Sequence, residues 1–485
     1  MSKQGSAPIR AAIHPSHGKA VGLAIAAAVG GFLFGFDSSV INGAVDAIKG
    51  EFALSAGVTG FAVAVALLGC AAGAWFGGHF ADRFGRTKVM LVGAILFFVS
   101  GFGSAFAVGV GDFIVWRIIG GLGIGIASVI APAYIAEIAP AAMRGRLASL
   151  QQLAITLGIF AALLSDAVFA NSAGGASEVS LFGIAAWQWM FLVSIVPAAI
   201  YGILALRIPE SPRFLVGAGR RDEALKVLTD VLGGDEDPVA RVAQIEASLE
   251  ADKAVTSKAS LRGSVLGLLP IVWVGILLSV FQQFVGINVI FYYSTTLWQT
   301  VGFTEQMSFV ASVITSITNV AVTLIAIALV DRIGRRPILL TGSAGMTIAL
   351  GVMALAFTHS SGSGAGVSLA APWGPIALVA ANLFVVFFGA SWGPVVWVLL
   401  GEMFPNRIRA AALGLAAAAQ WIANFAITIS FPPLLAAFGP TVPYLMYAVF
   451  AALSFFFVLV KIPETKGVEL EDMADVTVAR AAPKR

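Results

Sequence analysis

The pentapeptide DRFGR at residues 82–86 returns as DRIGR at residues 331–335. Two further matches follow in the same order, at separations of about 250 to 265 residues. They pair Glu137 and Arg144 with Glu402 and Arg409, and the tripeptide PES at residues 209–211 with PET at residues 463–465. Self-similarity at a nearly constant offset is the signature of a repeated structural unit. The sequence therefore predicts two similar halves.

Composition places these halves in a lipid bilayer. Of the 485 residues, 59% are hydrophobic and only 11% are charged, which is more apolar surface than a water-soluble core can bury. A backbone in a hydrocarbon layer of roughly 30 Å has to satisfy its own hydrogen bonds, so the spans are expected to be helices. Twelve apolar runs centre near residues 30, 68, 98, 124, 158, 198, 280, 318, 347, 386, 422 and 451. The predicted fold class is an all-α membrane protein with twelve transmembrane helices in two pseudo-symmetric six-helix bundles.

The first run begins near Val21 and is too long for the hydrophobic region of a cleaved signal peptide. It is expected to lead directly into Asp37 and a polar loop. The single cysteine, Cys70, falls in the second span and can form no intrachain disulfide.

Basic residues resist translocation and collect in cytoplasmic loops, so their distribution predicts the orientation. Four loops carry them, at Arg83, Arg86 and Lys88; Arg144 and Arg146; Arg332, Arg335 and Arg336; and Arg407 and Arg409. The alternate loops near residues 108, 175, 303, 365 and 438 hold no Lys or Arg, so both termini are expected in the cytoplasm. This pattern and the basic tails account for the net charge of +3 without any nucleic-acid binding.

The longest polar stretch separates six spans from six and includes a helix-like segment at residues 220–232. The expected division is a cytoplasmic N-terminal tail at residues 1–18, a first bundle at 19–208, a cytoplasmic linker with short amphipathic helices at 209–263, a second bundle at 264–462 and a cytoplasmic C-terminal tail at 463–485.

The repeated charged motif predicts a conformational latch at the cytoplasmic ends of the spans. Gly78 allows close helix approach, Gly85 permits a tight turn, and the aspartate can meet helix N-terminal amides or neighbouring arginines. A basic loop that only obeys the orientation rule is the alternative, and the second copy disfavours it. The latch would hold the outward-facing state and comprises Asp82, Arg83, Arg86, Glu137, Arg144, Asp331, Arg332, Arg335, Glu402 and Arg409.

The seventh span carries neutral polar side chains at membrane depth, where unpaired donors and acceptors are costly. These are Gln282, Gln283, Asn288, Tyr292 and Tyr293. A ligand rich in hydroxyl groups would satisfy them, and hydrogen bonds between helices are the alternative. Gln283 and Asn288 lie about 140° apart on a straight helix, so a bend near Gly286 is needed to direct both into one cavity. Broken helices near the midplane are common in carriers.

These motifs together resemble the sugar porter family of the major facilitator superfamily. The resemblance lies in QQFVGIN at residues 282–288 with the two tyrosines, PESPR at 209–213 and PETKG at 463–467, and it extends over residues 22–467. The family includes bacterial sugar/proton symporters and the facilitative glucose transporters of animals. It implies the major facilitator fold in a plasma membrane. The four His residues are scattered over tails and loops without a nucleophile, metal or nucleotide motif, so no enzyme, cofactor or metal site is expected.

The resemblance also implies hexose contacts on several spans. Amides can bond ring hydroxyls bidentately, and an indole can pack on the apolar face of a pyranose. Trp397 follows Gly393 and Pro394, where a helix break is expected, although for either Trp a core or interfacial role is an equal alternative. The predicted sugar-binding set is Gln152, Gln282, Gln283, Asn288, Tyr293, Asn319, Trp397, Gln420, Trp421 and Asn424.

Asp37 and Arg117 are the only ionisable residues expected well inside the spans, away from their cytoplasmic ends. Charges there are expensive and usually functional, and both residues fall in the outer half of the membrane, where they can pair. In sugar/proton symporters the matching aspartate is the protonation site and the matching arginine is its partner, so the resemblance implies these roles here. Animal facilitators generally have asparagine at the first position, which favours coupling here. A static ion pair that braces the helices is the alternative.

The sequence therefore predicts proton-coupled import of a monosaccharide by rocking of the two halves around a site near the midplane. Protonation of Asp37 would weaken its hold on Arg117 and let the halves close over the sugar. Ile159 is apolar where some xylose-transporting relatives have glutamine, which favours a hexose such as glucose. A uniporter of the same fold, or a sensor that binds sugar without transporting it, is the alternative. The expected partners are the sugar, the proton and the lipid bilayer, and the protein is expected to be monomeric.

Overall fold

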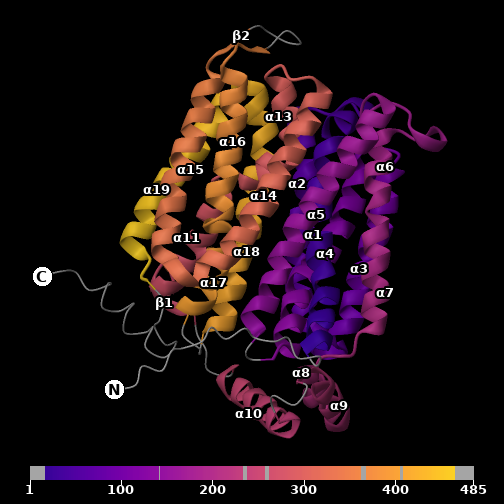
Figure 1. Ribbon diagram of the computed structural model, residues 1–485, viewed down its shortest axis with the longest axis vertical. Coiled ribbons are helices and arrows are strands. Elements are labelled where there is room, and N and C mark those ends of the chain that lie inside the picture. Colours follow the sequence, from indigo (N-terminus) through magenta and orange to yellow (C-terminus); the bar gives the residue numbers. More distant parts are fainter. Residues whose placement is uncertain are drawn as a thin grey trace, which may run out of the picture.

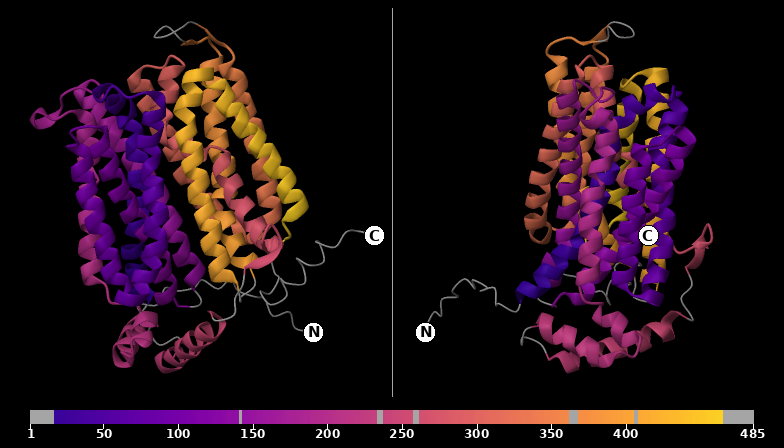
Figure 2. Two further views of the ribbon diagram at one scale, coloured as in Figure 1. Left: turned by 180° about the vertical axis from the view of Figure 1, so that it is seen from behind. Right: turned by 90° about the vertical axis from the view of Figure 1, so that its right-hand side faces the viewer.

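The computed structural model describes residues 17–140, 143–232, 237–256, 261–361, 368–404 and 408–464. Within this part of the chain, twelve helical segments are long and apolar enough to cross a membrane, as the sequence predicted. Helices of the first half form one bundle, indigo to magenta in Figure 1, and helices of the second half form a neighbouring one, orange to yellow. Figure 2 shows the same two bundles from behind and from the side.

The first half contains six spans. They are α1 (His17–Glu51), α2 (Ala56–Phe84), α3 (Arg86–Ala105), α4 (Val110–Ile138), α5 (Arg144–Ala173), and a sixth made of α6 (Ala186–Val193) and α7 (Ile195–Arg207), with the 3-10 turn η2 (Leu181–Gly183) before it.

The second half also contains six spans, two of which are interrupted. They are α11 (Pro270–Phe284) with α12 (Ile287–Tyr292) and α13 (Ser294–Thr300), α14 (Glu305–Ile333), α15 (Arg335–Phe357), α16 (Trp373–Gly389) with α17 (Trp392–Met403), α18 (Arg409–Phe438) and α19 (Thr441–Lys461).

Short helices lie across one end of the bundles, at the bottom of Figure 1. They are α8 (Pro212–Gly217), α9 (Arg221–Leu232) and α10 (Pro238–Thr256), followed by the strand β1 (Arg262–Val265). The helix α9 confirms the helix-like segment expected at residues 220–232. At the opposite end, β2 (Ser360–Ser361) pairs antiparallel with β3 (Ser368–Leu369). These two ends are called the linker end and the hairpin end below.

Glycine brings α1 and α5 into backbone contact near the centre of the first bundle. A Cβ atom on Gly35 of α1 would collide with the Ile155 carbonyl oxygen of α5, and one on Gly158 would collide with the Phe32 carbonyl oxygen. Close approach through small residues is a usual way to pack helices in a membrane, where no hydrophobic force drives them together. The contact fixes the position of Asp37, two residues beyond Gly35.

Two local expectations were wrong. The chain forms no polar loop after Asp37, because α1 continues to Glu51 and buries the polar Ser39 and Asn42 against its neighbours. The tenth span breaks at Ala390 and Ser391 rather than at the Gly-Pro pair. The proline instead falls in the first turn of α17, where its missing N–H is not needed.

Candidate functional site

The seventh span breaks at Gly286, between α11 and α12. This residue has a φ of 81°, and a Cβ atom there would lie 2.5 Å from a ring carbon of Tyr447. Only glycine adopts this left-handed conformation readily, and no side chain fits beside the ring. A second interruption at Tyr293 separates α12 from α13. The predicted bend near Gly286 is confirmed.

The bend brings the amides of the seventh span together. Asn288 Nδ2 donates to Gln283 Oε1 over 2.6 Å, and Gln283 Nε2 donates to Gln282 Oε1 over 3.4 Å. Gln282 Nε2 in turn donates to the Trp392 carbonyl oxygen over 2.9 Å, at the start of α17. The three amides therefore form one connected chain between the two broken spans. Gln282 thus makes a hydrogen bond between two helices, which was the alternative to ligand binding for these side chains.

A second polar network connects the seventh span to α18. The Tyr293 hydroxyl donates to the Thr428 carbonyl oxygen over 3.1 Å, and the Thr428 hydroxyl donates to Asn424 Oδ1 over 3.1 Å. Tyr293 and Asn424 are both buried. Like the three amides of the seventh span, these two predicted sugar contacts are already bonded within the protein.

The remaining predicted amides lie on three other spans. Gln152 of α5 and Gln420 of α18 are half-buried, and Gln420 Oε1 has no partner among the described residues. Asn319 of α14 is buried close to Gly389, where α16 ends before the break of the tenth span. The side-chain oxygen of Gln420 is therefore available to accept a hydrogen bond from a polar ligand.

The two predicted tryptophans lie differently. Trp421 of α18 packs edge-to-face against Phe34 of α1, with ring centroids 5.7 Å apart, so it connects the two halves. Trp397 of α17 is 44% exposed. The structure thus places one indole at the contact between the halves and leaves the other partly uncovered by protein.

Asp37 and Arg117 form a buried ion pair between α1 and α4. Arg117 Nη1 donates to Asp37 Oδ1 over 2.9 Å, and the side chains are 2% and 4% exposed, arginine first. The guanidinium carbon also lies 5.8 Å from the centroid of the Phe191 ring. Asp37 Oδ2 and Arg117 Nε have no hydrogen-bond partner among the described residues. The pair is thus held by one charge-assisted hydrogen bond, and losing that bond would leave a buried charge.

The expectation that only this pair is ionisable inside the spans was wrong. Asp166 of α5 is fully buried, and its Oδ2 accepts a hydrogen bond from the Gly43 N–H of α1. Asp46 also lies in α1, because that helix continues past the expected loop. The position of Asp166 inside the fifth span could have been found from the sequence, because the apolar run continues for seven residues beyond it.

Polar contacts join the two halves at the hairpin end. The Thr295 N–H donates to Asn42 Oδ1 over 3.0 Å, and its hydroxyl donates to the Asn42 carbonyl oxygen over 2.7 Å. One turn further, the Thr296 hydroxyl donates to Asp46 Oδ2 over 3.0 Å. A bond from the loop after α5 to Glu305 adds a contact at the rim. Sequence reasoning missed these residues, because the pairing of α1 with α13 has no local signature.

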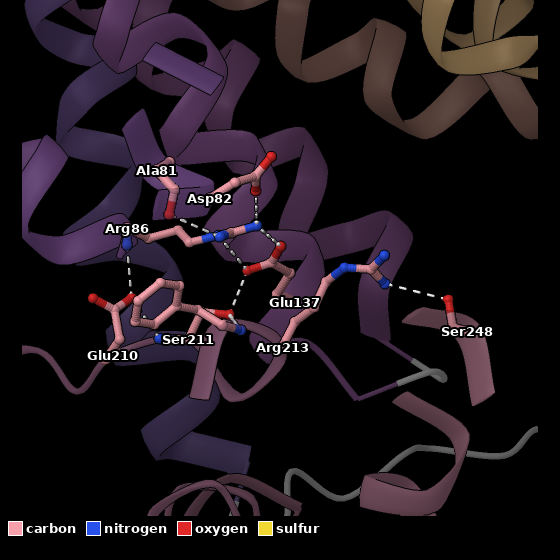
Figure 3. A network of polar contacts seen from close by, with 9 residues as sticks. Ala81, Asp82, Arg86, Glu137, Glu210, Ser211, Arg213 and Ser248 are labelled. Atoms are coloured by element: carbon pink, nitrogen blue, oxygen red, sulfur yellow. Dashed lines mark hydrogen bonds and ion pairs between the residues drawn. The ribbon is translucent and has the colours of Figure 1, made fainter. Parts of the chain in front are cut away.

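The first charged motif forms a network at the linker end (Figure 3). Arg86 binds both oxygens of Glu137 over 2.9 and 3.1 Å, and it also pairs with Asp82 over 3.0 Å. Ser211 donates a short hydrogen bond to Glu137. Glu210 accepts from the Arg86 N–H over 2.8 Å, so its carboxylate caps the first turn of α3. This network connects α3, α4 and the start of the linker within one half.

The second motif repeats this arrangement. Arg335 binds Glu402 over 2.8 Å, and Glu464 accepts from the Arg335 and Arg336 N–H groups over 3.0 and 3.1 Å at the start of α15. Arg83 of the first motif is exposed and lies over the Phe84 ring. The side chains of the predicted latch residues Arg144, Asp331, Arg332 and Arg409 lie outside the described residues.

A family model described as sugar (and other) transporter matches residues 23–476. The chain belongs to this sugar transporter family. It is 53% identical over 448 residues to a glucose transport protein of Synechocystis sp., covering 92% of this chain and 95% of that protein. It is 36% identical over 483 residues to the D-xylose-proton symporter of Escherichia coli, covering 93% and 94% of the two chains. The inward open conformation of the xylose transporter from E. coli matches with a TM-score of 0.80 at 33% identity, covering 94% of this chain and 99% of that one.

Family membership confirms three predictions. The chain is a sugar porter of the major facilitator superfamily, its twelve spans have that fold, and it is a transporter rather than an enzyme. As a twelve-span transporter of this family it is a multi-pass membrane protein.

Proposed function

We propose that this protein imports a monosaccharide such as glucose together with a proton, by alternating access to one site between its halves. The observation that carries the proposal is the buried ion pair of Asp37 and Arg117, because protonation of the Asp37 carboxylate would neutralise it and break the pair. Two similar proteins are named as a glucose transport protein and a D-xylose-proton symporter, which supports both substrates.

The sugar is assigned to the amide cluster of the seventh span and the polar residues around it. Neutral amides, hydroxyls and indoles suit an uncharged ligand that needs many hydrogen bonds and offers one apolar face. The assigned contacts are Gln152, Gln282, Gln283, Asn288, Tyr293, Asn319, Trp397, Gln420, Trp421 and Asn424.

The proton is assigned to Asp37, with Arg117 as its partner. Neutralising one member of a buried ion pair costs roughly 3–5 kcal/mol of the pair's mutual stabilisation. Reversing a two-state equilibrium from 1:99 to 99:1 takes about 5.5 kcal/mol. A proton shifts this equilibrium only by the difference in its affinity for the two states, so the proposal requires Asp37 to bind the proton more tightly in one state, and bound sugar supplies the rest.

The linker end is assigned to the cytoplasm, together with both termini, because the loops there carry the arginines. Residues 19–208 and 264–462 would be the moving bundles, 209–263 the cytoplasmic linker, and 1–18 and 463–485 the tails of a monomeric plasma-membrane protein. The hydrogen bonds at the hairpin end then close the outer side. The two arginine-glutamate networks brace each half and are proposed to form the latch when the inner side closes.

The test uses purified protein in proteoliposomes at equal pH on both sides. Added glucose should raise the external pH as protons enter with sugar, and no proton movement despite saturable glucose exchange would remove the symport proposal. The Asp37→Asn variant should lose accumulation against a gradient and keep exchange. Competition by unlabelled galactose, xylose and inositol would identify the preferred sugar.

A further inference from the structure

Asp166 is a carboxyl group that the proposed cycle leaves unused. It is 0% exposed in α5, and its Oδ2 accepts one hydrogen bond, 3.2 Å from the Gly43 nitrogen. Its Oδ1 has no partner among the described residues. A Cβ atom on Gly43 would lie 2.7 Å from the Asp166 side chain, so the glycine lets the carboxyl reach the backbone of α1. An ionised carboxylate removed from water in this way costs several kcal/mol.

The charged groups on the helices packed against α5 are directed elsewhere. Asp37 bonds Arg117, and Asp46 bonds Thr296. None of the described charged side chains makes a hydrogen bond or ion pair with Asp166, and α6 carries no charge. Toward the hairpin end, the charged residues of α1, α4 and α14 are Asp37, Asp46, Lys49, Glu51, Asp112, Arg117 and Glu305.

The hydrogen bond from Gly43 places Asp166 beside the contact that closes the hairpin end. Gly43 follows Asn42, which holds Thr295 of the other half through its side chain and its carbonyl oxygen. Of these two adjacent residues of α1, Gly43 therefore binds the Asp166 carboxyl of the same half, and Asn42 binds the short helix α13 of the other half. The other half also covers α5 directly, because α14 packs against α5 and α13 packs against α14. Separation of the halves at this end, with α13 leaving α1, would therefore let water approach the carboxyl.

We propose that Asp166 is a second proton-binding site, occupied while the hairpin end is closed and emptied when α13 separates from α1. Closing then takes up a proton, so acid on the hairpin side favours the closed state and alkali favours the open state. Gly43 lies six residues beyond Asp37, or about 9 Å along the helix. A proton that enters from the hairpin end would therefore reach Asp166 before it reaches the Asp37 pair. Its use in transport rests on the proposed function, whereas its protonation does not.

Infrared spectroscopy of the purified full-length protein tests the protonation directly. Near neutral pH, without sugar, the carbonyl stretching band of a protonated carboxylic acid should be present and should shift in heavy water. Asp166→Asn should remove this band, and its amide oxygen can still accept from Gly43. Asp112→Asn is the matched control, because Asp112 accepts from the Val108 N–H at the same end, and it should leave the band intact. A band unchanged in Asp166→Asn would overturn the proposal.

A distance measurement tests the coupling. Spin labels are placed at Val108 and Phe438, which are exposed at the hairpin end of the two halves, in a Cys70→Ser background. The closed population should rise as the pH falls in the parent, and in Asp166→Asn it should be higher near neutral pH and change less with pH, the remaining change coming from Asp37. The same pH profile in both proteins would sink the coupling. A transporter without sugar-driven proton movement would refute the proposed symport and leave both of these readouts intact.

Discussion

Thr295 holds Asn42 twice, through an amide that donates to the side-chain oxygen over 3.0 Å and a hydroxyl that donates to the carbonyl oxygen over 2.7 Å. The two residues belong to different halves and both are buried. Thr295 lies just beyond both interruptions of the seventh span, at Gly286 and at Tyr293. The residue that bonds Asn42 therefore belongs to a short segment that is separate from α11.

Thr295→Val should shift the protein toward an open hairpin end. The substitution removes the hydroxyl bond and keeps the shape, and a bond of this kind contributes about 1 kcal/mol, or roughly a fivefold change in the equilibrium. The distance between labels at the hairpin end measures the shift. Thr300→Val is the control, because that hydroxyl donates to the Thr296 carbonyl within the same helix. Equal shifts in the two variants would contradict the role of the contact with Asn42.

Gly286→Ala should impair both folding and transport. A left-handed conformation costs an L-residue roughly 1–2 kcal/mol, and the new methyl group also meets the Tyr447 ring. Thermal unfolding should begin at a lower temperature, and glucose exchange per folded molecule should fall. Gly351→Ala in α15 has open space at its Cβ position and serves as the control. Wild-type exchange in Gly286→Ala would show that the bend is not needed.

Asn288→Ala should weaken sugar binding more than it weakens the fold. Loss of a neutral hydrogen bond costs about 0.5–1.5 kcal/mol, so the KM for glucose should rise roughly two- to tenfold. Asn382→Ala removes another amide of the second half, which bonds Thr318 and the Leu378 carbonyl oxygen. The assignment fails if this control raises the KM as much as Asn288→Ala does.

Arg86→Lys should destabilise the first half although the charge is kept. Lysine cannot bind both oxygens of Glu137 as the guanidinium does, and charge-assisted bonds contribute roughly 1.5–3 kcal/mol each. A lower midpoint of thermal unfolding is the expected result. Arg83→Lys changes an exposed arginine of the same motif and should have little effect. Matching losses in the two variants would mean that the Glu137 bonds add no stability.

The repeats and the apolar runs predicted the architecture because both are local patterns. The bend at Gly286 was also predictable, since Gln283 and Asn288 cannot face one cavity from a straight helix. By contrast, α1 had been expected to end soon after Asp37. The polar Asn42 instead lies inside the helix, where its side-chain oxygen and its carbonyl oxygen accept hydrogen bonds from Thr295 of α13.

Asp166 shows a second limit of the sequence. Its place in the fifth span could be read from the apolar run, but its burial depends on where α1 crosses α5. The contact with Gly43 joins residues 123 positions apart, and no periodicity within one span reveals it. The break at Ser391 was misplaced by two residues for a related reason, because proline inside a first helical turn gives no signal distinct from a break.

In each half, a carboxylate that follows the last span binds back to the start of that half's third span; these carboxylates belong to Glu210 and Glu464. Glu210 follows the sixth span and binds the first turn of α3, and Glu464 follows the twelfth span and binds the first turn of α15. During synthesis, every residue of the first network, from Asp82 to Ser211, is therefore made before any residue of the second half. The second network likewise lies within one half. Two fragments separated within residues 233–236 and produced together should therefore assemble into a working carrier.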